Sequence, residues 1–127
     1  MLTTIERPVP AQGTITPERA LMLARQRFPN LCSGGILGRK AIGQPVDLWH
    51  VAQAVTVLAA CRKAVIPRMH SYDLRAAIGG VTLGSVICAA VALGFRVDTW
   101  QGDTAFAPHC LIGVDARDVE RVAASFQ

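Results

Sequence analysis

The chain has 127 residues, of which 51% are hydrophobic, 17% are charged and 6% are aromatic, and its formal net charge at pH 7 is +4. A chain of this length is typical of one domain that buries roughly two-thirds of its unfolded surface, so the fold requires no disulfide or metal. The composition excludes intrinsic disorder, a collagen-like repeat and a disulfide-rich scaffold.

The first elements are an arm, a helix and a loop. Two prolines predict that residues 1–14 form an extended arm, which precedes a single globular domain over residues 15–127. Thr16 and Pro17 are the residue types that favour a helix start, and the apolar spacing after them predicts an amphipathic helix over residues 17–28. The glycine-rich stretch 31–44 is predicted to be a loop, with at most a short strand.

The next predicted helix is apolar almost all round. Asp47 is a good N-cap for a helix over residues 48–62, in which we expect Trp49 and Leu58 to be buried. A second nearly apolar helix, over residues 82–93, follows in the same short chain. Because one small domain has difficulty covering both helices, this pattern favours a homodimer or another homo-oligomer.

The second half of the chain alternates helices, turns and strands. The expected elements are a short helix 73–78, a Gly79-Gly80 turn, a helix capped by Thr82, strands 96–100 and 110–114, and a last helix 116–125. Two strands directly after a helix-turn-helix have the order of a winged helix. We therefore expect an α+β, mainly helical domain with a winged-helix-like order, a two-stranded hairpin near the C-terminus and a final helix. A small hairpin that closes an α+β core is the alternative.

Residues 73–95 have the outline of a DNA-binding helix-turn-helix. Within them, residues 79–94 read GGVTLGSVICAAVALG, with a Gly-Gly-Val-Thr opening, a Val-Ile pair four residues after the Thr and a Leu-Gly close. This segment resembles the helix-turn-helix of the GcrA-type cell-cycle regulators, and the likeness covers sixteen of the 127 residues. The resemblance implies DNA binding. However, the second helix carries no Arg, Lys, Asn or Gln that would read a base, which is the pattern of a core helical hairpin.

Basic residues are concentrated in the middle of the chain. Residues 19–75 carry nine basic and two acidic side chains, a net +7, whereas residues 1–18 carry −1 and residues 76–127 carry −2. Such a block attracts duplex DNA or an acidic protein surface. The candidate nucleic-acid-binding or partner-binding residues are Arg39, Lys40, Arg62, Lys63, Arg68, Arg75, Thr82 and Ser85.

These signals leave two function classes ahead of a third. The first is a small DNA-binding regulator or accessory protein. The second is a protein-binding module, such as an inhibitor or adaptor that docks on an acidic or nucleic-acid-handling partner. The third is a cysteine-dependent enzyme, which would need Cys32 as nucleophile with His109 or His50 as its base. Because Cys32 has no evident helix N-terminus or fixed base, we expect no catalytic residue.

Other sites and locations are less favoured by the sequence. The loop 33–40 lacks the spacing of a phosphate-binding P-loop, and the four cysteines fit no metal template, so we expect no cofactor and no metal. We expect reduced thiols and a cytoplasmic protein. Residues 76–95 are twenty uncharged residues, but their paired glycines and polar residues favour a buried helix over a membrane span.

Overall fold

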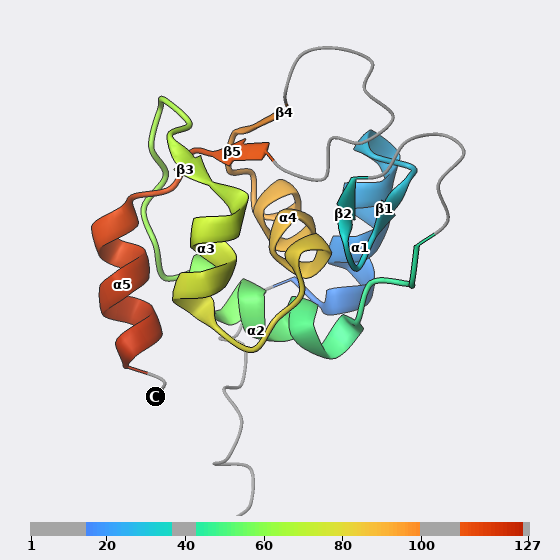
Figure 1. Ribbon diagram of the computed structural model, residues 1–127, viewed down its shortest axis with the longest axis horizontal. Helices are drawn as coiled ribbons and strands as arrows, with labels where there is room; N and C mark the ends of the chain where they lie inside the picture. Colours follow the sequence, from blue (N-terminus) through green and yellow to red (C-terminus); the bar gives the residue numbers. More distant parts are fainter. Residues whose placement is uncertain (1–14, 37–42, 100–109, 126–127) are drawn as a thin grey trace, which may run out of the picture.

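The computed structural model describes residues 15–36, 43–99 and 110–125. Within these ranges the chain forms five α-helices and two small antiparallel sheets (Figure 1). In chain order the elements are α1 (Pro17–Arg27), β1 (Leu31–Cys32), β2 (Gly35–Ile36), α2 (Leu48–Leu58), β3 (Met69–His70), α3 (Ser71–Ile78), α4 (Leu83–Ala92), β4 (Val97–Thr99), β5 (Cys110–Ile112) and α5 (Ala116–Ala124). The predicted α+β, mainly helical class is confirmed. The predicted arm, residues 1–14, lies outside the described residues.

Four of the five described helices begin after a residue whose side chain caps them, whereas Thr82, the predicted cap of α4, makes no side-chain capping hydrogen bond. The hydroxyl of Thr16 accepts a hydrogen bond from the backbone N–H of Arg19 at 3.2 Å, and the Asp47 carboxylate accepts from the N–H of Trp49 at 2.9 Å. These contacts satisfy N–H groups that have no partner within the helix. The α3 cap uses a less common acceptor, because the ring Nδ1 of His70 accepts a hydrogen bond from the Tyr72 N–H at 3.2 Å.

The two sheets are short. Strands β1 and β2 form a hairpin with Leu31 opposite Ile36. In the second sheet the strand order is β3-β5-β4, so the predicted β4–β5 pairing is present, but β3 adds a third strand. With only two residues, β3 is too short for an alternating pattern to reveal it in the sequence.

Helix α4 lies at the centre of the domain, between α3 and α1, and α2 also packs against it (Figure 1). Residues 86–90 of α4 have no exposed surface. Helix α1 approaches closely because its buried positions, Ala20 and Ala24, are small. In α2, Leu58 is buried as predicted, but the prediction for Trp49 was wrong: 41% of its surface is exposed, because the first turn of α2 extends beyond the core.

The β1–β2 hairpin covers the start of α4 at Gly84. The Gly84 N–H donates a hydrogen bond to the carbonyl of Ser33 at 2.9 Å. A Cβ atom at position 84 would lie 1.7 Å from the carbonyl oxygen of Cys32, so only glycine permits this contact. The hairpin is thus fixed to α4 through backbone atoms.

In the part of the chain that the structure describes, no single helix is long and apolar enough to cross a membrane. Helices α3 and α4 have the length and composition only when taken together, and the chain bends by 101° between them.

Replacing Leu58 by Ala leaves a cavity among fully buried side chains. We expect this variant to lose about 2–5 kcal/mol of unfolding free energy, as is typical for a core Leu→Ala change. Chemical denaturation measures the loss. The control is Leu48→Ala in the same helix, where the side chain is exposed; equal stability of the two variants would contradict the assigned core.

Replacing Gly84 by Ala forces a methyl group into the carbonyl of Cys32. The hairpin must then move away from α4, and we expect a loss of about 1–3 kcal/mol, the usual cost of overpacking. Gly34→Ala is the control in the same hairpin, because its nearest atom, the Cys32 Sγ, is 4.0 Å from the added Cβ. A Gly84→Ala variant as stable as the wild type would show that the hairpin does not rest on α4.

Candidate functional site

The two helices predicted on either side of Gly79-Gly80 are present as α3 and α4. Gly79 and Gly80 have φ angles of 77° and 70°, values that residues with a side chain rarely adopt. They form the turn between α3 and α4, where the chain bends by 101°. The Arg75 Nε donates a hydrogen bond to the carbonyl of Val81 at 3.1 Å and fixes the turn. His50 supports the other side, since its Nδ1 accepts from the Thr82 N–H at 3.3 Å.

The start of α4 does not form an exposed reading surface. Ser85 is completely buried and its hydroxyl pairs with that of Thr82, which is itself half-buried. In this structure Ser85 therefore cannot reach a nucleic acid or a partner, and that prediction was wrong. The physical reason is that the hairpin lies over Gly84 and covers this face of α4. A covered helix face cannot contact base edges.

Two of the predicted basic residues serve the fold. The guanidinium of Arg62 forms ion pairs with Asp118 at 2.9 Å and with Asp115 at 3.6 Å. The Lys63 Nζ lies 5.8 Å from the centre of the Phe95 ring, within the range of a cation–π contact. Arg62 is thus paired within the protein, although 78% of its side chain is exposed.

The other two predicted arginines line separate hollows. Arg75 lies at a hollow of about 360 Å³ over the α3–α4 turn, together with His50 and Thr82. Arg68 lies at a hollow of about 600 Å³ between the segment before β3 and the start of α5. Arg68 and Arg75 therefore belong to different hollows, whereas Arg62 contacts Asp115 at the hollow that Arg68 lines. Arg39 and Lys40 lie outside the described residues.

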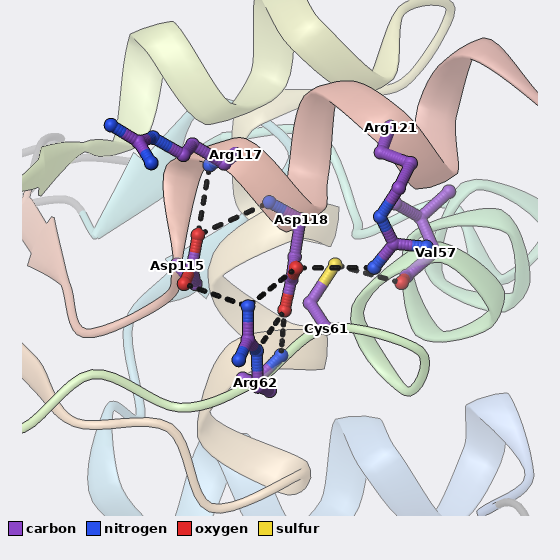
Figure 2. Close-up of polar contacts among 7 residues, drawn as sticks. All are labelled: Val57, Cys61, Arg62, Asp115, Arg117, Asp118 and Arg121. Carbon is purple, nitrogen blue, oxygen red and sulfur yellow. Dashed lines mark hydrogen bonds and ion pairs between the residues drawn. The ribbon is translucent and has the colours of Figure 1, made fainter.

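The strongest polar cluster surrounds Asp118, a carboxylate with only 3% of its surface exposed (Figure 2). It accepts hydrogen bonds from the backbone N–H of Arg62 at 2.9 Å, from Arg62 Nε at 2.9 Å and Nη2 at 3.3 Å, and from Arg121 at 3.1 Å. These contacts join the end of α2 to α5 and satisfy the buried charge.

The Arg62 and Arg121 contacts hold the pKa of the Asp118 carboxyl well below its usual range. The carboxylate is therefore ionised at neutral pH and fully occupied by protein donors, so the cluster is a structural joint and no proton donor. Sequence reasoning missed it because Arg62 and Asp118 are 56 residues apart. A basic pair after α2 and an acid in the first turn of α5 are each common surface features.

All four cysteines are buried and free. Burial raises the pKa of Cys88 to about 12 and that of Cys110 to about 11, which keeps these thiols protonated. The Cys32 Sγ contacts the carbonyl of Gly35 at 3.5 Å inside the hairpin. His109 lies outside the described residues, and among the described residues no three His, Cys, Asp or Glu side chains are grouped to hold a metal ion.

Comparison with known proteins gives no relative: no family model, no curated protein and no solved structure matches the chain.

The Asp118 cluster predicts a pH dependence of stability. A carboxyl whose pKa is lowered on folding stabilises the protein above the unfolded value of about 3.9, and that contribution is lost as the pH falls toward the folded pKa. We expect Asp118→Asn to lower the thermal midpoint at pH 7 and to flatten its fall between about pH 5 and pH 2.

The matched control is Asp98→Asn, which removes the carboxylate of an exposed ion pair with Arg96. Scanning calorimetry at several pH values should give this variant the wild-type pH profile, because exposed pairs contribute little. An Asp118→Asn variant with an unchanged midpoint and an unchanged profile would exclude the proposed joint.

Proposed function

We propose that this protein is a protein-binding module, an adaptor or inhibitor, rather than a protein that reads DNA sequence. The observation that carries the proposal is the burial of α4, whose residues 83–90 are all inside the domain. Sequence-specific proteins of the helix-turn-helix class place side chains of this helix against base edges. Here the hairpin and α1 occupy that side of the helix.

The distribution of polar and apolar side chains gives independent support. Several large apolar side chains are exposed, and Val65 and Ile66 are the most exposed of them, at 84% and 56%. Among the predicted basic residues, Arg62 is paired with Asp118. Adjacent exposed apolar residues are typical of protein interfaces.

DNA binding is the second candidate, because the order of elements favours it. From α2 to β5 the chain runs helix, strand, two helices at 101°, and two paired strands, the order of a winged helix. On this alternative the protein would bind phosphates without base readout, through residues such as Arg68 and Arg75.

Titration of random duplex DNA with the full chain separates the two candidates. We expect no binding up to about 100 µM protein at physiological salt, the weak limit of non-specific DNA binding. A parallel selection from a displayed library of random peptides should enrich binders. Saturable DNA binding whose salt slope falls by about 0.9 in each of Arg68→Ala and Arg75→Ala, without any enriched peptide, would establish the second candidate instead.

A further inference from the structure

The hollow of about 600 Å³ beside α5 has an apolar floor. Its apolar lining residues are Ala64, Ile66, Met69, Val114 and Ala116. Figure 1 shows that the segment between α2 and β3 runs beside the start of α5. The segment is fixed there by a hydrogen bond from the Ala64 N–H to the carbonyl of Gly113 at 2.8 Å. The hollow is therefore supported by the backbone on both sides.

Two arginines at the rim of this hollow have no acidic partner. Arg68 and Arg117 line it, and neither side chain forms an ion pair with any described residue. Two carboxylates also line the hollow. That of Asp115 is already engaged, because it accepts hydrogen bonds from two N–H groups of α5 and faces Arg62 at 3.6 Å, so Asp73 alone stands against the two arginines. The rim can therefore accept negative charge from a ligand.

One more apolar side chain of the same segment is exposed, although it does not line the hollow. Val65 follows Ala64 along the same segment and leaves 84% of its surface exposed. A small anion would leave the apolar lining uncovered, and a phosphate backbone offers no apolar group to cover it. The combination of apolar floor and arginine rim is that of a protein interface, in which Arg supplies directed contacts around buried apolar groups.

We propose that this hollow is the docking site for a peptide segment of a partner protein, one that places an apolar side chain on the floor and flanking Asp or Glu side chains on Arg68 and Arg117. This proposal rests on the protein-binding function proposed above and names its surface. Arginine forms paired hydrogen bonds with a carboxylate. The two arginines therefore select a peptide with acidic side chains and determine the positions of those side chains along it.

The test begins with the full chain and a displayed library of random dodecapeptides. We expect enriched peptides to carry a Leu, Ile, Met or Phe with Asp or Glu on either side. When the best enriched peptide is added to the isotopically labelled protein, the amide NMR shifts should change at residues 64–69 and 114–117.

Two pairs of exposed-site variants complete the test. The double variant Arg68→Glu, Arg117→Glu should weaken binding of that peptide at least tenfold, which is roughly the effect of losing one well-made charged contact. The control Arg19→Glu reverses an exposed charge on α1 and should not change binding. Likewise Ile66→Ser should weaken binding, whereas Met22→Ser, at an exposed apolar position on α1, should not.

The outcomes separate the two levels of the proposal. Enriched peptides that bind the Arg68→Glu, Arg117→Glu protein as well as the wild type, or that shift amides elsewhere, overturn the docking site and leave the protein-binding function in place. Selection of no peptide at all overturns both. Binding of random duplex DNA that depends on Arg68 and Arg117 would instead assign the hollow to nucleic acid.

Discussion

Helix α4 can occupy the centre of this fold because Gly84 has no side chain. The carbonyl of Cys32 lies where a Cβ atom would be, and the Gly84 N–H is bonded to Ser33. This single backbone contact holds the β1–β2 hairpin over the start of α4. Helix α1 then packs on the same helix through two alanines, and the apolar surface of α4 is covered without a second protein copy.

This arrangement decides what the rest of the molecule can do. Because residues 83–90 of α4 are buried, this helix presents no side chains there for contact with base edges. The strongest polar contacts lie at α5, where Asp118 accepts hydrogen bonds from Arg62 and so joins the end of α2 to α5. The surface beside that joint retains the unpaired arginines and exposed apolar side chains, which are the features that a protein partner can use.

Local chemistry allowed much of the fold to be predicted from the sequence. Capping residues such as Asp47 and turn glycines such as Gly79 act within a few residues, so helix starts and the α3–α4 turn were evident. Contacts between distant segments were not, since nothing local places Ser33 on Gly84 or Arg62 on Asp118. The candidate site suffered most, because charge counts along the chain do not reveal which arginines are already paired.

Native-state hydrogen exchange of the full chain tests the burial of α4 most directly. If α1 and the hairpin are integral parts of the core, the amides of residues 86–90 exchange only when the whole protein unfolds, with the free energy found by denaturation. Exchange of these amides through a local opening of much lower free energy than that of the core amides of α2 would contradict this. Such exchange would mean that α1 and the hairpin separate from α4 in the folded protein, so that the surface of α4 becomes available to a ligand.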